Sequence, residues 1–411
     1  MNHIRIFSLL CILLYPLIST AQVMPGIEVL ERDGFDILKG KRVGLLTNAT
    51  GVDSRLRSTI DILHAAPDVE LKALFAPEHG VRGDIAAGEH VAGGTDPATG
   101  VRVYSLYGAT KRPTPEMLRD IDVMVYDIQD NGCRSYTFIS TMGLAMEACA
   151  AAGKEFVVLD RPDPLGGNKV EGPVTAPGST NFLARYPIPY IYGLTPGELA
   201  RMIVGEGWLK SAKPLKLTVV PMDGWDRGML YDDTLLPWVP TSPQLPSAET
   251  AIYYPATGIA GELDYVSIGV GYTLPFRTVA TTWINDRRLA DELNGRQIPG
   301  VLFRPISYKP WFGFKAGKNL KGVQVYVTDF DAAPLTLIQF HIMDALARLY
   351  PAHRASVGAK ATRFDMFDKV TGSKQIRPAF FSNHSVDDIM PLWEKGTEDF
   401  RKSKQKYHLY Q

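Results

Sequence analysis

The stretch FAPEHGVRGD, at residues 75–84, gathers two carboxylates, an imidazole and a guanidinium within seven positions. These groups belong to Glu78, His79, Arg82 and Asp84, and the two glycines among them predict a turn whose backbone can approach a ligand closely. A carboxylic acid held on such a turn can protonate the leaving oxygen of a polar substrate. The structural alternative is an ordinary loop in which the histidine only holds the turn.

Other polar side chains follow the remaining predicted strands. Ligands of open α/β sheets bind beyond the carboxyl ends of the strands, so these side chains are expected to meet at one edge. The candidates for binding or catalysis there are Asn48, His79, Arg82, Asp127, Gln129, Asp130, Arg134, Tyr136, Arg161 and Asp163. Each also has a structural interpretation: an aspartate can cap a helix, Arg134 and Arg161 can pair with Asp130 and Asp163, and Tyr136 can belong to the core.

The elements that would position these residues alternate between strand and helix. Strands are predicted at 42–48, 70–75, 101–107, 123–128, 156–160 and 215–220, and nearly continuous apolar runs of this kind suit a parallel sheet covered on both faces. Helices are predicted after Thr114, over 140–153 with Gly153 as the C-cap, and after Thr195, where Glu198 completes a capping box. The expected fold is a Rossmann-like, doubly wound α/β domain over residues 22–240.

The sequence changes in character near Trp238, where a Pro- and Ser-rich connector begins. A smaller α+β domain is expected over 241–411, with strands near 264–270, 278–284 and 322–328 and helices at 334–349 and 386–405. Residues 1–21 have a basic start, an apolar run and a small-residue end, which predict a signal peptide and a periplasmic or secreted protein without a membrane span.

Composition and missing motifs exclude several classes of function. Lys+Arg and Asp+Glu are balanced at 44 each, so nucleic acid is not an expected partner. No G-x-G-x-x-G, G-x-x-x-x-G-K-[ST], G-x-S-x-G or H-E-x-x-H occurs, so no nucleotide cofactor or metal is predicted. A metal-dependent hydrolase using His79, Asp84, Glu89 and His90 is kept as an alternative. Cys133 and Cys149 allow a disulfide but do not require one.

Carboxylates in polar and aromatic company suit the cleavage of glycosidic bonds, in which one acid protonates the leaving oxygen and a second group acts at the anomeric carbon. The aromatic side chains that could pack against sugar rings are Tyr104, Tyr107, Tyr136, Tyr190 and Tyr192.

Several motifs resemble one family. GLLTNATGVD, LFAPEHGVRGD, DIQDNGCRSYTFISTM, LDRPDPLGG and GLTPGELA, with the C-terminal FDKVTGS and KYHLY, are similar to the NamZ-type exo-β-N-acetylmuramidases, long catalogued as a domain of unknown function. The resemblance runs from about residue 42 to residue 410. It implies a Rossmann-like domain without nucleotide, a smaller C-terminal domain, an active site in the cleft between them, and release of N-acetylmuramic acid from non-reducing ends of peptidoglycan fragments.

The resemblance also implies roles for residues. Glu78 corresponds to the general acid, and Asp127 and Asp130 are the carboxylates of the DIQD motif, of which either one could assist it. Burial near these aspartates is expected to keep Glu78 protonated. Because a nearby cation would favour the charged form of Glu78, Arg82 and Arg134 are expected to face the aspartates.

The chain departs from the family pattern at SIGVGYTLPF, residues 267–276, where Val270 replaces an Arg and Tyr272 a Thr, and at Tyr192, which replaces a His. The alternatives are therefore a glycosidase for a different amino sugar and a glycan-binding protein without activity.

Overall fold

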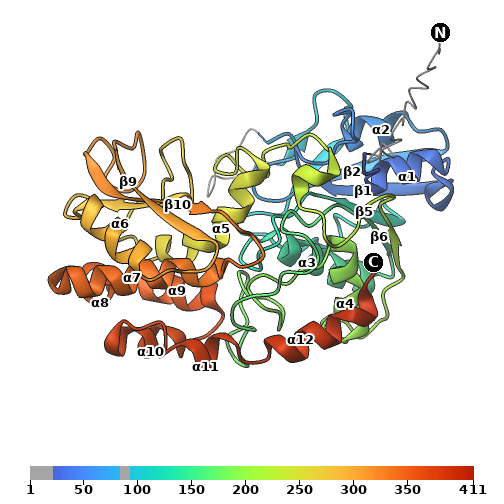
Figure 1. The fold of residues 1–411 in the computed structure, drawn as a ribbon. Coiled ribbons are helices and arrows are strands. Elements are labelled where there is room, and N and C mark those ends of the chain that lie inside the picture. The colour runs from blue at the N-terminus through green and yellow to red at the C-terminus, as the bar shows by residue number, and fades with distance from the viewer. Residues whose placement is uncertain (1–21, 84–92) are drawn as a thin grey trace, which may run out of the picture.

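The structure is a computed structural model that describes residues 22–83 and 93–411. A larger part, built around a mostly parallel sheet, lies beside a smaller part built around an antiparallel sheet (Figure 1). This arrangement confirms the predicted α/β class with a smaller α+β domain.

The larger sheet has seven strands in the order β3-β4-β2-β1-β5-β6-β7. Neighbouring strands are parallel except β3 and β4, which pair antiparallel at one edge. The chain order reverses between β1 and β5, so the carboxyl ends of these strands form the crevice where sheets of this kind bind ligands. The strands are β1 (Lys41–Thr47), β2 (Val69–Ala76), β3 (Gly94–Thr95), β4 (Arg102–Ser105), β5 (Val123–Asp127), β6 (Glu155–Leu159) and β7 (Leu217–Val220).

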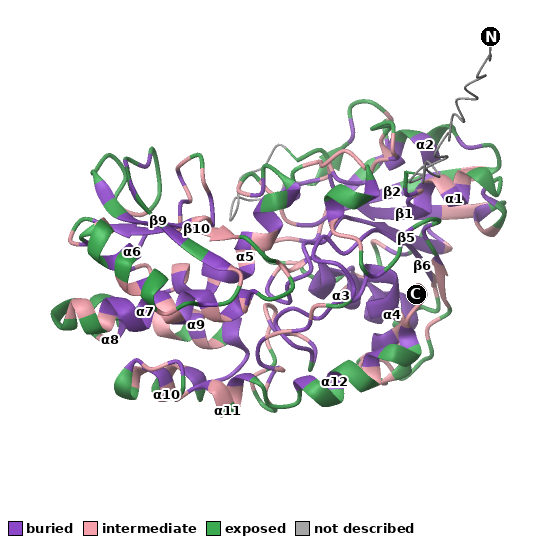
Figure 2. Ribbon diagram, viewed as in Figure 1, coloured by how far each residue is buried: buried purple, intermediate pink, exposed green. Residues whose placement is uncertain are grey.

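Helices cover both faces of this sheet because the strands carry apolar side chains on both faces. Leu45 and Val125 pack with α1 and α2, whereas Leu46 and Tyr126 pack with α3 and α4. In Figure 2 the central strands are buried, and exposed residues gather on the outer helices and loops. The helices of this part are α1 (Gly26–Arg32), α2 (Thr59–Ala65), α3 (Phe138–Ala152) and α4 (Pro196–Gly205).

The local signals for two of these helices are confirmed. α3 ends at Gly153, whose φ of 68° is the left-handed conformation that glycine adopts easily. α4 begins with the Thr195–Glu198 capping box, with Pro196 in its first position. The helix expected after Thr114 is wrong: residues 115–120 form only turns before β5 begins, too short a segment to propagate a helix.

The smaller part contains a three-stranded antiparallel sheet, in the order β8-β10-β9, packed against helices. Its strands are β8 (Thr278–Thr281), β9 (Val301–Tyr308) and β10 (Leu320–Val327). Its helices are α5 (Ala248–Gly261), α6 (Asp286–Gly295), α7 (Ile338–Leu349), α8 (Ala355–Gly358), α9 (Phe364–Thr371), α10 (Ile376–Asn383), α11 (Met390–Trp393) and α12 (Thr397–Lys404). Short 3-10 helices are η1 (Asp36–Leu38), η2 (Tyr231–Thr234), η3 (Leu335–Leu337), η4 (Pro351–His353), η5 (Ala361–Arg363) and η6 (Gln405–Tyr407).

Two predicted elements of this part, one strand and one helix, are wrong. Residues 264–270 form no strand beyond an isolated bridge between Ser267 and Ala280, because Gly269, at φ 85°, turns the chain there. The helix expected over 386–405 is broken into α11 and α12 by Gly396, which has a φ of 80°. The helix predicted at 334–349 is present as η3 followed by α7.

The C-terminal segment returns to the larger part. Phe400 and Tyr407 join the core under α3 and α4, and the Tyr410 hydroxyl donates to Asp160 at 2.6 Å. The segment after α11 therefore fastens the two parts together, although it lies in the expected C-terminal domain.

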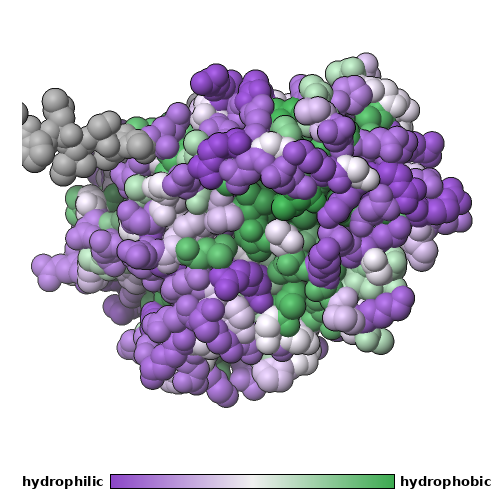
Figure 3. Space-filling view, turned by 90° about the vertical axis from the view of Figure 1, so that its right-hand side faces the viewer, coloured by the Kyte–Doolittle hydropathy of each residue, from purple (hydrophilic) through white to green (hydrophobic). Residues whose placement is uncertain are grey.

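In the described part of the chain, Cys133 and Cys149 are buried free thiols. No helix among the described residues is long and apolar enough to cross a bilayer. Figure 3 shows the side of the larger part, where hydrophilic residues cover most of the face and hydrophobic ones group near its middle.

Candidate active site

A cleft of about 770 Å³ opens between the two parts of the molecule, and Glu78 lines it. The larger part contributes the turn after β2 and the start of α3, and the smaller part contributes α5 and the loops around residues 270 and 312. The lining residues are Glu78, His79, Ser135, Tyr136, Thr137, Phe138, Leu183, Ser242, Pro243, Gln244, Tyr254, Glu262, Val270, Phe276, Phe312 and Val370. The volume and its mostly apolar, aromatic lining with a few polar groups are typical of a small-ligand site.

Parallel pairing of β2 and β4 places a hydroxyl beside Glu78. Ala76 pairs with Ser105 at the ends of the two strands, and Glu78 and Tyr107 each follow two residues later in the chain. The Tyr107 hydroxyl donates to Glu78 Oε1 at 2.8 Å. Glu78 is half-buried, so its carboxyl group is oriented by the protein and also accessible from the cleft.

The turn after Glu78 needs unusual backbone geometry. His79 and Gly80 have φ values of 74° and 76°, which reverse the chain directly after the acid. A Cβ on Gly83 would lie 2.8 Å from the Ala49 side chain, so the turn packs closely against the loop after β1. The glycines of the motif therefore allow the tight packing that presents Glu78.

Tyr136 lies between the cleft and the carboxylates behind it. Its hydroxyl donates to Thr241 at 2.8 Å, and its ring contacts Tyr254 edge-on, at 5.6 Å between centroids. Burial raises the pKa of Tyr136, and the negative charges of Asp130 and Glu78 add to this rise. Tyr136 is thus close to both acids.

The cleft contains a second carboxylate that the sequence analysis missed. Glu262 directly follows α5, and its Oε2 accepts a hydrogen bond from the Arg363 guanidinium at 2.8 Å. Burial raises the pKa of Glu262, and the Arg363 charge opposes this rise. No local signal marked Glu262, because only the packing of the second domain brings it to the cleft.

Asp130 lies behind the cleft wall. It is buried, and its Oδ2 accepts hydrogen bonds from the Tyr192 hydroxyl and from the backbone N–H of Gly132. Burial raises the pKa of Asp130 to about 7, against the effect of the Tyr192 hydrogen bond. Asp163 lies nearby, and burial raises the pKa of its carboxyl group to about 8, with the Asp130 charge adding to the rise.

Asp127 belongs to a closed network at the crevice between β1 and β5. Arg161 pairs with it, with 2.9 Å between Nη2 and Oδ2, and the Thr59 hydroxyl donates to the same oxygen. The Asp127 and Arg161 side chains are 0% and 4% exposed, so this pair is sealed from solvent.

Asn48 and Gln129 lie in the same network. Asn48 Oδ1 accepts hydrogen bonds from the backbone and hydroxyl of Thr50, and the Gln129 amide donates to the carbonyls of Asp130 and Pro162. Beside Gln129 and Arg161 is a cavity of only about 10 Å³, covered by side chains between residues 231 and 239. That volume accommodates about one water molecule. Asn48, Asp127, Gln129 and Arg161 are therefore separate from the cleft.

The expectation that Arg82 and Arg134 face the aspartates is wrong. Arg82 forms two hydrogen bonds of 3.0 Å with Asp96 and one of 3.3 Å with Asp61. Arg134 is buried and donates to four backbone carbonyls, those of Pro173, Ile188, Val370 and Thr371. A buried guanidinium needs hydrogen-bond acceptors for its N–H groups. Two of the acceptors of Arg134 are at the end of α9, so Arg134 links the larger part to that helix.

The remaining aromatic candidates divide into buried side chains and side chains at the cleft. Tyr190 and Tyr192 are fully buried, and Tyr104 packs against Phe75 with 5.5 Å between ring centroids. Tyr107 and Tyr136 are the two of this group that contact or line the cleft. Of the four residues in the metal-dependent alternative, Asp84, Glu89 and His90 lie outside the described residues. Within residues 22–83 and 93–411 no group of three His, Cys, Asp or Glu side chains could hold a metal ion.

The fold and the cleft define a class: a two-domain α/β protein in which a carboxyl group at a strand end faces a site between the domains. The sequence matches the description exo-beta-N-acetylmuramidase NamZ, N-terminal, over residues 43–249 and exo-beta-N-acetylmuramidase NamZ, C-terminal, over residues 252–410. It is 43% identical over 389 residues to the peptidoglycan beta-N-acetylmuramidase NamZ of Bacillus subtilis (strain 168), covering 95% of this chain and 92% of that protein.

Two solved structures of DUF1343 family proteins from Bacteroides fragilis NCTC 9343 share the fold. One superimposes with a TM-score of 0.91 at 52% identity and the other with a TM-score of 0.74 at 27% identity. Each comparison covers 95% of this chain and 99% of the other. The chain belongs to the exo-beta-N-acetylmuramidase NamZ family, a family of glycosidases, which confirms the resemblance found in its motifs.

Proposed function

We propose that this protein is an exo-acting glycoside hydrolase that releases N-acetylmuramic acid from the non-reducing ends of peptidoglycan fragments. The observation that carries the proposal is Glu78, oriented by Tyr107 and lining a cleft between the two domains of a NamZ family chain. The peptidoglycan beta-N-acetylmuramidase NamZ of B. subtilis, to which the chain is similar, supports the choice of substrate.

Glu78 acts as the general acid in this proposal. A sugar alkoxide leaves poorly at neutral pH, so protonation of the glycosidic oxygen accelerates its departure, by about 10²–10⁴-fold for a well-placed acid. Tyr107 holds one carboxyl oxygen, which fixes the direction in which the acid presents its proton.

The second role falls to a group inside the cleft. Asp127 is sealed in its ion pair with Arg161, and Asp130 lies behind the wall, so we assign neither a direct attack on the sugar. Glu262 lines the cleft, and the substrate's own 2-acetamido group is the other available nucleophile. A Glu262→Gln variant separates these routes. A loss as large as that of Glu78→Gln assigns the role to Glu262, and a small loss assigns it to the acetamido group.

The proposal is tested with a chromogenic β-glycoside of N-acetylmuramic acid beside its N-acetylglucosamine analogue. Hydrolysis of the first and little of the second is the expected result. The reverse preference would assign a different amino sugar. Absence of hydrolysis of both, with binding of glycan fragments, would favour the glycan-binding alternative.

We also propose that the protein is exported and that its catalysis requires no metal or nucleotide. The sequence of residues 1–21 and the absence of phosphate-binding and zinc-binding motifs support these proposals. N-terminal sequencing of the protein from the periplasm or medium should begin near Gln22. Turnover that is lost in excess chelator and restored by zinc or manganese would contradict the metal-independent mechanism.

A further inference from the structure

The loop between β9 and β10, residues 309–319, contains three aromatic residues, of which two line the cleft or the compartment beside it. Phe312 lines the compartment that contains Glu78, and Phe314 lines a neighbouring compartment of about 310 Å³. Trp311 directly precedes Phe312 in the loop and is 70% exposed, and Phe312 is 51% exposed. Single exposed apolar residues are ordinary, but a group beside a cleft marks a binding surface.

The structure holds this loop in a defined position. The backbone N–H of Trp311 donates to the Gly271 carbonyl at 2.8 Å. A Cβ on Gly271 would lie 2.0 Å from the Phe312 carbonyl oxygen, so the two loops are in close contact. Tyr272 stacks on Tyr308 at 4.4 Å and lies 6.0 Å from the Trp311 ring.

A separate small core supports the loop from beneath. Its members are Ala280, Ile306, Tyr308 and Leu320, with Tyr272, Leu274 and Phe314 packed against them. A surface that is already ordered loses little conformational entropy when a ligand binds.

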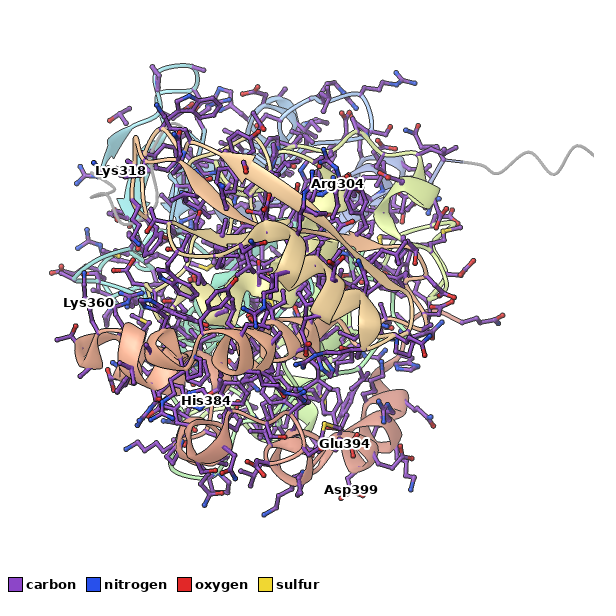
Figure 4. All side chains as sticks on the ribbon, turned by 60° about the vertical axis from the view of Figure 1, so that its left-hand side comes forward. Arg304, Lys318, Lys360, His384, Glu394 and Asp399 are labelled. Atoms are coloured by element: carbon purple, nitrogen blue, oxygen red, sulfur yellow. The ribbon has the colours of Figure 1, made fainter. Side chains whose placement is uncertain are left out.

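The charge of the loop is positive. Residues 309–319 contain Lys309, Lys315 and Lys318 and no acidic residue. Lys315 donates to the hydroxyls of Thr281 and Thr282, at 3.0 and 2.8 Å, and so fastens the loop to β8. Lys309 and Lys318 are exposed and have no carboxylate partner within the described residues. Figure 4 shows Lys318 at the outer edge of the molecule.

We propose that Trp311, Phe312, Lys309 and Lys318 form a binding surface for the glycan chain on the leaving-group side of the scissile bond. This inference rests on the proposed function: an exo-acting enzyme keeps the terminal sugar beside Glu78, and the rest of the chain then leaves the cleft over its rim. Sugar rings present apolar C–H faces that pack on aromatic rings. The lactyl carboxylates of peptide-free muramic acid residues match the charge of the two lysines.

The kinetic test compares Trp311→Ala with the unchanged protein on two substrates: a chromogenic monosaccharide glycoside and a peptide-free glycan chain of at least four sugars. We expect kcat/KM on the chain to fall about tenfold, mainly through KM, which corresponds to about 1.4 kcal/mol. The monosaccharide should be affected less than twofold. Leu302→Ala is the matched control, because Leu302 is 56% exposed on β9. Equal losses on both substrates, or no loss on the chain, would overturn the proposal.

A binding test is independent of turnover and separates the two proposals. Calorimetry with the Glu78→Gln protein compares peptide-free glycan chains with neutral N-acetylglucosamine oligomers of equal length. Lys309→Ala/Lys318→Ala should weaken binding of the charged chains several-fold and reduce its salt dependence, with little change for the neutral oligomers. Lys321→Ala, an exposed lysine on β10, is the control. Equal effects on both ligands would show that the two lysines do not recognise the charge of the glycan chain. If the unchanged protein hydrolyses nothing, the proposed activity fails. The glycan surface is then judged by binding, and it fails if Trp311→Ala leaves chain binding unaltered.

Discussion

Two polar regions of the larger domain use the same residue types and differ in what surrounds them. At the cleft, Glu78 is half-buried, oriented by Tyr107, and faces a volume of about 770 Å³. At the crevice between β1 and β5, Asp127 is fully buried and paired with Arg161, which lines a cavity of about 10 Å³. The crevice is where α/β sheets ordinarily bind ligands, yet in this protein a chain segment covers it.

This difference shows how one sheet edge supports two functions. A buried carboxylate must be paired because an unpaired charge is costly in the interior. A carboxylic acid that transfers protons must instead reach its substrate. The closed network therefore holds the strand ends in place, and the neighbouring strand end presents Glu78, the proposed general acid.

The largest effect expected is on stability, from Asp127→Asn. This change leaves the Arg161 guanidinium buried without its counter-charge, which typically costs about 3–5 kcal/mol in the free energy of unfolding. Urea unfolding measures the loss. Asp122→Asn is the control, because Asp122 pairs with Arg42 where both side chains are about 40% exposed, at 40% and 41%, and such pairs contribute about 1 kcal/mol or less. Similar losses in both variants would mean that the crevice network is no more important than a surface pair.

On the cleft side, Glu78→Gln keeps the shape of the side chain and removes its proton. Turnover of a substrate with a sugar leaving group should fall at least about a hundredfold. The loss should be smaller for a nitrophenyl leaving group, which needs little protonation, and the unfolding free energy should hardly change. An equal loss on both substrates would show that Glu78 is not the acid.

The buried acids should make stability depend on pH with a sign that can be derived. Burial raises the pKa of Asp163 from 3.8 to about 8. The folded state therefore favours the protonated form, and its contribution to stability is complete below about pH 3.8 and is lost as the pH rises through about 8. For one such group the unfolding free energy falls by about 1.4 kcal/mol per pH unit within this range.

Asp163→Asn removes this titration and keeps the oxygen that accepts from Leu165. Between pH 6 and 8 the variant should lose less stability than the unchanged protein. Lys404, whose pKa burial lowers to about 7, has the opposite sign in both proteins, so the difference between them is the measured quantity. Parallel pH profiles, with the exposed Asp232→Asn as control, would contradict a proton on Asp163.

The smallest effect expected is that of Tyr107→Phe, which removes the hydroxyl that orients Glu78. A single hydrogen bond of this kind is worth about 1 kcal/mol, so kcat should fall about fivefold. Tyr104→Phe, on β4 three residues before Tyr107, is the comparison and should leave kcat nearly unchanged. A larger loss in the Tyr104 variant would show that β4 packing, rather than this hydroxyl, positions the acid.

The sequence by itself determined the α/β order, the caps of α3 and α4, and the place of Glu78 at the end of β2, because these depend on local periodicity and on turn residues. The sequence also predicted that the polar candidates lie at one edge of the sheet. It did not predict the break at Gly396 or the bend at Gly269, where single left-handed glycines interrupt an otherwise suitable pattern.

Only the tertiary structure decided which of these candidates meet. Arg134 binds carbonyls from segments far apart in the chain, Glu262 reaches the cleft from the second domain, and the segment at 231–239 covers the crevice. Local patterns specify where a side chain stands on its own strand or helix. What covers it is set by the packing of remote segments, and that packing made Glu78 accessible and enclosed Asp127.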